Sequence, residues 1–252
     1  MKNLPFALLV VILVAGGYIY YDSARENHRG SVDKNFRDSV ETVLVENPEI
    51  LVKAMQTYQE KMRQNQLDQF KNAVNENHDN LKLADSPSFG NPNGDIVLVE
   101  FMDYLCGHCR QVAPIVEQLT KENPSLKVVV KLLPIFGPQS TVFAKAGQAA
   151  AQQGKFSAFH ELLLSKVNPK MTREELIAVA KEAGLNLQAF EKVIDAETDP
   201  LLEENKQLAQ KLGIRGTPFF IFLSQPYNPQ KTEVMAGSGT KESFEEKIKQ
   251  TK

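Results

Sequence analysis

Only two cysteines occur among the 252 residues, so a fold held together by several disulfides is excluded. Histidine is also scarce: apart from the one between the two cysteines, the histidines are His28, His78 and His160, in separate segments. A tetrahedral zinc site built from cysteine and histidine is therefore not supported. The net charge is −2 and no long basic run is present, which gives no electrostatic basis for nucleic-acid binding.

The two cysteines form a single Cys-x-x-Cys motif, Cys106-Gly107-His108-Cys109. An apolar pattern typical of a buried strand precedes the motif and a helical pattern follows it, so Cys106 is expected at the first turn of a helix. Backbone N–H groups and the helix dipole stabilise a thiolate at that position and lower the pKa of Cys106. We expect Cys106 to be an exposed nucleophile and Cys109 a more buried resolving thiol, with His108 favouring the reduced form.

This pattern predicts a dithiol that is repeatedly oxidised and reduced. A permanent structural disulfide is less favoured, because closing so short a loop stabilises a fold only slightly. Half of a zinc site is also less favoured, since the motif would need two further ligands. The predicted redox centre is therefore the Cys106–Cys109 disulfide itself, with no metal and no separate cofactor.

The N-terminus indicates export. An apolar stretch runs from Leu4 to Tyr21, behind Lys2, and the next charged residue is Asp22. Residues 1–21 fit either a cleaved signal peptide or a retained membrane anchor, because about 18 apolar residues are just enough to span a bilayer. Both alternatives place the rest of the chain outside the cytoplasm, where disulfides persist. The predicted location is the periplasm of a bacterial cell envelope, with tethering to the inner membrane if the segment is retained.

Residues 22–86 are predicted to be helical, with a boundary at Asn47-Pro48, because Asn favours the N-cap and Pro the first helical turn. On the second helix one apolar face is followed by a shift of phase; its residues are Leu51, Met55, Tyr58 and Met62, and then Leu67, Phe70 and Val74. Such a face packs either on the rest of the chain or on another subunit. We favour self-association into a homodimer or homotrimer.

Residues 87–252 show an α/β pattern. The stretch 86–94 is rich in Ser, Pro, Gly and Asn and is predicted to be a linker. Strands are predicted at 96–99 and 126–133, and a helix at 107–122 between them makes a βαβ unit. A helical insertion is predicted at about 139–211, and residues 219–223, 233–236 and 240–250 then predict a hairpin of strands and a closing helix. The prediction is an α/β domain with a helical insertion, preceded by an all-α extension.

Two motifs in this domain carry a resemblance to a known family. The strand that runs from Val97 into Cys106-Gly107-His108-Cys109, and the segment Gly213-Ile-Arg-Gly-Thr-Pro-Phe219, are similar to the DsbA family of thioredoxin-fold oxidoreductases. The resemblance covers about residues 91–252. It implies a thioredoxin fold, in which helices flank a central mixed sheet, and it implies that the helical extension belongs to a long form of the family.

The resemblance also implies a role for each matching residue. Cys106 and Cys109 match the nucleophile and the resolving cysteine, and Thr217-Pro218 matches a loop that carries a cis-proline and faces the dithiol. An extended substrate strand is expected to bind at Thr217, Pro218 and Gly107. From the pattern alone, Glu100 lies either at the exposed end of its strand or buried beneath the site. In the resemblance it matches a buried acid that accepts the proton of the resolving thiol.

The implied function is thiol–disulfide exchange on exported proteins, by forming or by isomerising disulfides. Gly107-His108 differs from the Pro-His of the best-known oxidases and matches protein disulfide isomerase. The implied partners are unfolded or misfolded cysteine-containing proteins and a membrane or periplasmic redox partner. The alternative is a non-enzymatic chaperone or surface-binding protein that retains a thioredoxin fold.

Overall fold

The structure, a computed structural model, describes residues 34–81 and 85–252. The segment 1–21, predicted to be a signal peptide or a membrane anchor, lies outside these residues. None of the helices within 34–81 and 85–252 has both the length and the apolarity that crossing a membrane requires.

Within residues 34–81, two helices precede the sheet: α2 (Lys34–Glu46) and α3 (Glu49–Leu81), with the predicted break at Asn47-Pro48. The chain divides into two compact units, residues 1–65 and 66–252. The predicted helical region ended at residue 86, whereas the structure assigns its last part, from Gln66 onward, to the unit that contains the sheet. In the first unit the large apolar side chains of α2 and α3 are mostly exposed; they include Phe36, Val45, Met55 and Tyr58.

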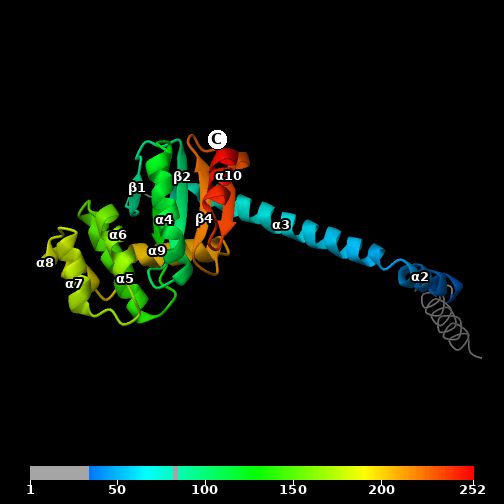
Figure 1. The fold of residues 1–252 in the computed structure, drawn as a ribbon, viewed down its shortest axis with the longest axis horizontal. Coiled ribbons are helices and arrows are strands. Elements are labelled where there is room, and N and C mark those ends of the chain that lie inside the picture. Colours follow the sequence, from blue (N-terminus) through cyan, green and yellow to red (C-terminus); the bar gives the residue numbers. More distant parts are fainter. Residues whose placement is uncertain (1–33, 82–84) are drawn as a thin grey trace, which may run out of the picture. The chain divides into compact units, whose positions relative to one another are not determined.

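A mixed five-stranded sheet forms the centre of the second unit (Figure 1). Its strands are β1 (Ser88–Gly90), β2 (Ile96–Met102), β3 (Leu126–Leu132), β4 (Phe219–Ser224) and β5 (Glu233–Ala236), in the order β1-β3-β2-β4-β5. The strands β2 and β3 are parallel and the other pairs are antiparallel, which confirms the βαβ unit and the hairpin.

The predicted linker at 86–94 is wrong in its middle, because Ser88–Gly90 is the edge strand β1. Ser88 pairs with Val129 of β3, and the Pro87 carbonyl accepts a hydrogen bond from the Val130 N–H at 2.8 Å. Turn-forming residues predicted a loop here because a strand of three residues has too little periodicity to be read from the sequence.

Seven helices accompany the sheet within the described part of this unit. The helix α4 (Gly107–Glu122) connects β2 to β3, and α10 (Lys241–Thr251) closes the chain. The predicted helical insertion lies between β3 and β4 and consists of α5 (Pro138–Gln152), α6 (Phe156–Lys166), α7 (Arg173–Glu182), α8 (Leu187–Ile194) and α9 (Pro200–Lys211). At the start of α7, Thr172 and Glu175 form a reciprocal capping box, a sequence signature of a helix N-terminus.

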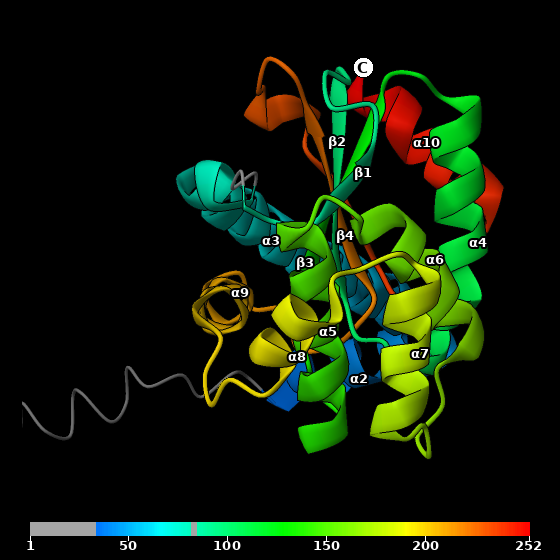
Figure 2. The same ribbon diagram turned by 90° about the vertical axis from the view of Figure 1, so that its left-hand side faces the viewer.

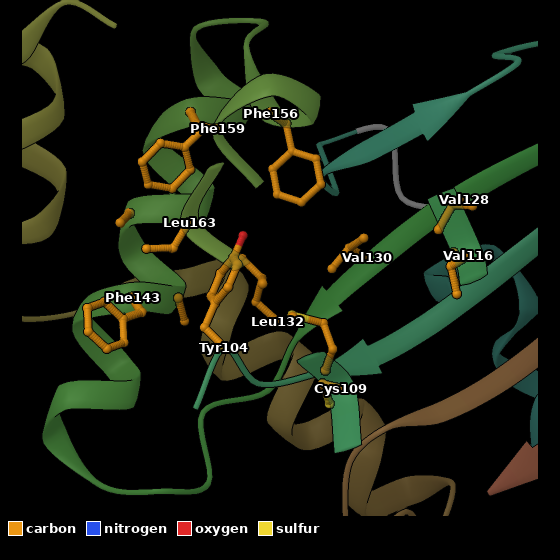
Figure 3. Close-up of a cluster of buried hydrophobic side chains, with 14 of the residues drawn as sticks. Tyr104, Cys109, Val116, Val128, Val130, Leu132, Phe143, Phe156, Phe159 and Leu163 are labelled. Carbon is orange, nitrogen blue, oxygen red and sulfur yellow. The ribbon is translucent and has the colours of Figure 1, made fainter. Parts of the chain in front are cut away.

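Helices cover both faces of the sheet (Figure 2). One face packs against α4, α10 and the insertion helices α5 to α8, and part of this core, with Tyr104, Cys109 and Phe159, is drawn in Figure 3. The other face packs against α9 and the last turns of α3, where Val74 and Leu81 are fully buried. Because β2 is buried on both faces along its whole length, every residue in it is apolar except Glu100.

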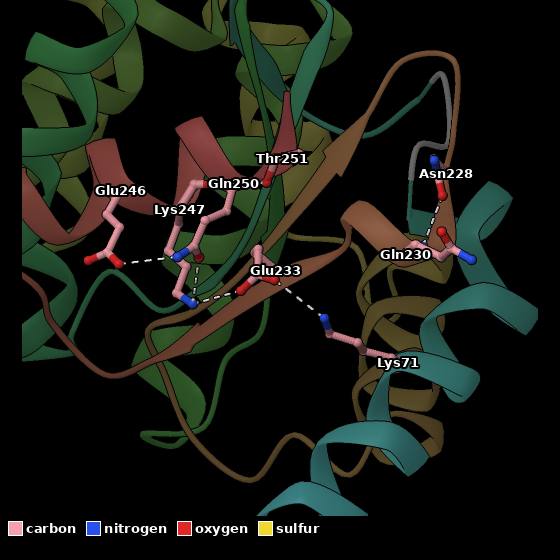
Figure 4. A network of polar contacts seen from close by, with 8 residues as sticks. All are labelled: Lys71, Asn228, Gln230, Glu233, Glu246, Lys247, Gln250 and Thr251. Atoms are coloured by element: carbon pink, nitrogen blue, oxygen red, sulfur yellow. Dashed lines mark hydrogen bonds and ion pairs between the residues drawn. The ribbon is translucent and has the colours of Figure 1, made fainter.

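The last turns of α3 are held to the sheet by an aromatic contact and an ion pair, in addition to the buried side chains. The ring of Phe70 lies 5.2 Å from that of Phe219. The Lys71 ammonium is 3.3 Å from the Glu233 carboxylate, which also binds Lys247 of α10 at 2.7 Å (Figure 4). These contacts place residues 66–81 in the same folding unit as the sheet.

A buried lysine completes this attachment. Lys131 of β3 is fully buried, and its ammonium donates hydrogen bonds to the Asn80 carbonyl and to the Ser86 hydroxyl, each at 2.8 Å. Burial lowers the pKa of Lys131 to about 8. The negative charge of Glu204 raises this pKa and so offsets part of the effect of burial. The hydrogen bonds offset part of the cost of burying the cation, and they tie the end of α3 to the sheet.

We predict that Phe70→Ala lowers the free energy of unfolding by about 2 kcal/mol, because Phe70 is half-buried and a fully buried phenylalanine costs roughly twice as much. Urea denaturation measures this change. Gln69→Ala, an exposed neighbour on the same helix, is the control and should leave the stability nearly unchanged. Equal stabilities for the two variants would contradict the packing of α3 against the sheet.

Candidate active site

The Cys-x-x-Cys motif lies at the junction between β2 and α4, as the sequence predicts. Cys106 is the N-cap of α4, with extended backbone angles, and its carbonyl accepts the first helical hydrogen bond from the Arg110 N–H at 3.1 Å. The Cys106 thiol makes no capping hydrogen bond to the helix backbone. The sulfur therefore sits at the positive end of the helix and is not used to hold the helix together.

The Cys106 sulfur contacts the loop that the second motif forms. Its thiol donates to the Thr217 carbonyl at 3.2 Å, and the Thr217–Pro218 peptide bond is cis. The predicted meeting of Cys106 with Thr217 and Pro218 is thus present in the structure, although the two segments lie 111 residues apart.

The prediction that Cys106 is exposed is wrong. The residue is only 3% exposed, and its sulfur is hydrogen-bonded to the Thr217 carbonyl. The exposed positions of the motif are Gly107 and His108. A Cβ atom at Gly107 would meet nothing within 4 Å, so there is open space next to this residue.

Cys109 lies one helical turn further and is fully buried, as predicted. Burial raises the pKa of the Cys109 thiol, and the negative charge of ionised Glu100 raises it further. The two cysteines are free thiols in this structure, and the Cys109 thiol interacts with that of Cys106. Cys109 is thereby held as a thiol beside the nucleophile, which suits a resolving group.

Glu100 is buried beneath the dithiol, as predicted, and is 3% exposed. Burial raises the pKa of Glu100 to about 8, so its carboxyl group is mostly protonated at neutral pH. The residue also lines a cavity of about 380 Å³ between α4 and α6, together with Arg110, Glu117 and His160. Glu100 thus borders a cavity with both polar and apolar lining residues, and it is close enough to the Cys109 thiol to affect its pKa.

Sequence reasoning missed Asp103. This residue is 2% exposed, and its carboxylate accepts hydrogen bonds from the N–H groups of Leu105 at 2.8 Å and Ile135 at 2.7 Å, and from the Ser140 hydroxyl. It joins the turn before Cys106 to the loop after β3 and to the start of α5. A charged residue at the end of a buried strand, three positions before the motif, was the available signal.

A buried polar pair was also missed. The Tyr104 hydroxyl is hydrogen-bonded to Nδ1 of His160 at 3.0 Å, and both residues are buried (Figure 3 shows Tyr104). Burial lowers the pKa of His160 to about 3, so its ring is neutral, and burial together with the charge of Glu100 raises the pKa of Tyr104. The pair links α6 to the strand end that carries the dithiol. Nothing in the local sequence pairs residues 56 positions apart.

No group of three or more His, Cys, Asp or Glu side chains within 34–81 and 85–252 is arranged to hold a metal ion. The polar groups near the dithiol are instead those suited to moving protons: one carboxyl with a raised pKa and one buried thiol.

We predict that Glu100→Gln changes how stability depends on pH. The native protein keeps a proton on Glu100 that the unfolded chain loses between pH 4.5 and about 8, so the free energy of unfolding falls as the pH rises through this window. The loss amounts to several kcal/mol, since each unit of pKa difference is worth about 1.4 kcal/mol. Denaturant unfolding of both reduced proteins from pH 4.5 to 8 measures it. Parallel pH profiles for wild type and Glu100→Gln would contradict the raised pKa.

Comparison with known proteins agrees with this geometry. Residues 97–249 match the model of the DSBA-like thioredoxin domain. The structure of BcfH from Salmonella enterica Typhimurium is similar to 94% of this chain over 99% of its own, with 26% identity and a TM-score of 0.74. A thioredoxin-like oxidoreductase from Silicibacter pomeroyi is 31% identical, covers 68% of this chain and 95% of its own, and has a TM-score of 0.59.

Part of the chain is also similar to part of proteins named Na⁺/H⁺ antiporters. The Na⁺/H⁺ antiporter NhaA 3 of Salinispora tropica is 28% identical over 147 residues, which are 57% of this chain and 22% of the antiporter. This chain thus spans about a fifth of the length of that relative, and the match carries no transport activity over to it. The family match covers more than half of the chain, from the strand that holds Glu100 to the last helix. This protein therefore belongs to the DsbA-like family of thioredoxin-fold thiol–disulfide oxidoreductases.

Proposed function

We propose that this protein is an exported oxidoreductase that forms or isomerises disulfides in other exported proteins through Cys106 and Cys109. The observation that carries the proposal is the arrangement of three groups. The Cys106 sulfur lies at the helix N-terminus and 3.2 Å from the Thr217 carbonyl, Cys109 is buried beside it, and Glu100 lies beneath both.

In the oxidising direction the protein starts with a Cys106–Cys109 disulfide. A substrate thiolate attacks the Cys106 sulfur, a bond forms between substrate and Cys106, and Cys109 leaves as a thiolate. A second substrate thiolate then attacks the substrate sulfur of this mixed disulfide and releases Cys106. The substrate loses two electrons, which remain on the reduced Cys106–Cys109 dithiol until a membrane or periplasmic redox partner removes them.

Glu100 supplies the proton that this exchange requires. Its pKa of about 8 leaves the carboxyl group mostly protonated near neutral pH, so it can protonate Cys109 when that thiolate leaves. In the reverse direction the carboxylate accepts the proton of Cys109, whose own pKa is raised by burial. The cavity that Glu100 lines gives the proton a path to and from solvent.

Substrate recognition is proposed at the loop of Thr217 and Pro218. An extended substrate strand that pairs with the Thr217 backbone would bring its cysteine next to Cys106. Gly107 favours this approach, since it is exposed and leaves open space where a side chain would project. His108, also exposed, is proposed to favour the reduced state by its N–H donor or positive charge.

In the isomerising direction reduced Cys106 attacks a wrong substrate disulfide, and Cys109 releases the enzyme if rearrangement stalls. The helical extension supports this mode if it assembles a homodimer or homotrimer that holds several dithiols around one substrate. The export signal predicted at 1–21 supports a periplasmic location.

We predict that Cys106→Ser abolishes both oxidation of a reduced test protein and refolding of a scrambled one, because the nucleophile is lost. Cys109→Ser is the matched variant: it should still attack substrates but accumulate mixed disulfides, which mass spectrometry detects. If Cys106→Ser kept full activity in cells, the protein would instead act as a non-enzymatic chaperone or surface-binding protein.

For the assembly, we predict that wild type sediments as a dimer or trimer and that Leu51→Glu with Met55→Glu sediments as a monomer. Both side chains are large, apolar and exposed within the first unit, where Leu51 is 48% and Met55 62% exposed, and a charge there opposes apolar packing between subunits. Gln56→Glu, on the same helix, is the control and should not change the mass. A monomeric wild type, or an unchanged mass in the double variant, would refute the assembly.

A further inference from the structure

Two apolar side chains stand out on the surface of the second unit. Within residues 66–81 and 85–252, Ile135 and Phe136 are the only exposed large hydrophobic side chains, at 45% and 55%. They follow Pro134 in the loop between β3 and α5. Because they are adjacent in the sequence, they place exposed apolar side chains together at this loop.

A groove of about 740 Å³ begins at this loop. It is bounded by the loop residues 133–135, by α9 from Leu202 to Gln210, and by Ile214 and Arg215 of the turn before Thr217. We call it the α9 groove. Its lining includes the apolar side chains of Leu133, Ile135, Leu202 and Ile214.

Two features of the structure connect the groove with the dithiol: a shared hydrogen-bond acceptor and a short separation along the chain. The N–H of Ile135 and that of Leu105, the residue before Cys106, bind the same Asp103 carboxylate. Arg215 lies two residues before Thr217, whose carbonyl accepts from Cys106, so their Cα atoms are within about 7 Å. A chain attached to Cys106 through its own cysteine therefore reaches the groove with its neighbouring residues.

The charged side chains of the groove are not equally available. Lys145 donates to the Ala196 carbonyl, Lys206 lies 3.7 Å from Glu203, and Asp199 caps the N-terminus of α9. Among the described residues, Arg215 takes part in no hydrogen bond or ion pair, and its side chain is exposed at the end of the groove next to Thr217. The groove thus presents apolar side chains and the guanidinium group of Arg215, and the exposed carboxylate of Glu197 also lines it.

We propose that the α9 groove binds the segment of an unfolded substrate chain that flanks its reacting cysteine, with an apolar side chain against Ile135 and Ile214 and a carboxylate at Arg215. This proposal rests on the proposed function and names the specificity of the same site. An unfolded chain is the occupant that the structure favours, because the groove continues directly from the point where substrate is covalently attached, and because such chains expose apolar side chains. A carboxylate completes the match, since guanidinium binds it with paired hydrogen bonds.

The test measures how fast the thiolate of a short peptide attacks Cys106, forms a mixed disulfide and releases Cys109, by acid quench and mass spectrometry. Each peptide holds one cysteine and one leucine, with aspartate or lysine two or three positions from the cysteine, on either side. With wild type we expect the better aspartate peptide to react about twofold to fivefold faster than its lysine counterpart at low concentration, the size of an exposed ion pair. The limiting rate at saturation should not change.

The variants assign this preference to the groove. Arg215→Ala should abolish the preference and Arg215→Glu should reverse it, while Ile135→Gln should slow all leucine-containing peptides about fivefold, because contact with part of one apolar side chain is lost. Lys211→Glu, with the same change of charge at the exposed end of α9 outside the groove, is the control and should keep the preference.

Several outcomes would overturn the proposal. These are no preference in wild type, a preference that survives Arg215→Ala, or an equal loss in Lys211→Glu, which would show a general effect of charge. A changed sedimentation mass in Ile135→Gln with unchanged peptide rates would make the groove an interface for a second copy. Reduction by dithiothreitol, which is too small to fill the groove, tests the dithiol alone: a disulfide that dithiothreitol also fails to reduce overturns the proposed function itself.

Discussion

The antiparallel pairing of β2 with β4 is the constraint on which the site depends. Its register sets Phe101 opposite Phe219 and Glu100 opposite Phe220. The end of β2 that leads into Cys106 therefore lies beside the start of β4, which follows Thr217 and Pro218. A shift of the register by one residue would turn Glu100 from the α4 face of the sheet to the opposite face and separate it from Cys109. The contact between the Cys106 sulfur and the Thr217 carbonyl is a direct consequence of this register.

Burial then distinguishes the groups that the register brings together. Glu100 and Cys109 are both removed from water, and burial raises the pKa of each because the charged form loses its hydration. The interaction between them adds to the effect on Cys109. One protonated carboxyl group and one thiol are thus buried near the nucleophile and close enough to influence each other, which suits the transfer of a proton while the disulfide opens or closes.

The helix α3 explains the phase shift in the apolar stripe of the N-terminal region. The residues before the shift, including Met55 and Tyr58, are exposed in the first unit, whereas Phe70 and Val74 after it pack on the sheet of the second. Packing on the rest of the chain therefore holds for the end of α3, and the exposed part before the shift is the part to which the proposed self-association applies. Phe70 contacts Phe219, the residue that follows Pro218, so α3 supports the loop that faces the dithiol.

The sequence by itself determined what depends on neighbours along the chain: the single dithiol at a helix N-terminus, the βαβ unit, the helical insertion and the capping box at Thr172. The resemblance of two short motifs added the thioredoxin fold and the partnership of Cys106 with Thr217 and Pro218. Only the tertiary structure decided the burial of Cys106, the roles of Asp103 and the Tyr104–His160 pair, and the edge strand at Ser88–Gly90. The physical reason is that burial and hydrogen bonding across 32 to 111 residues depend on how sheet and helices pack, and no local periodicity records that packing.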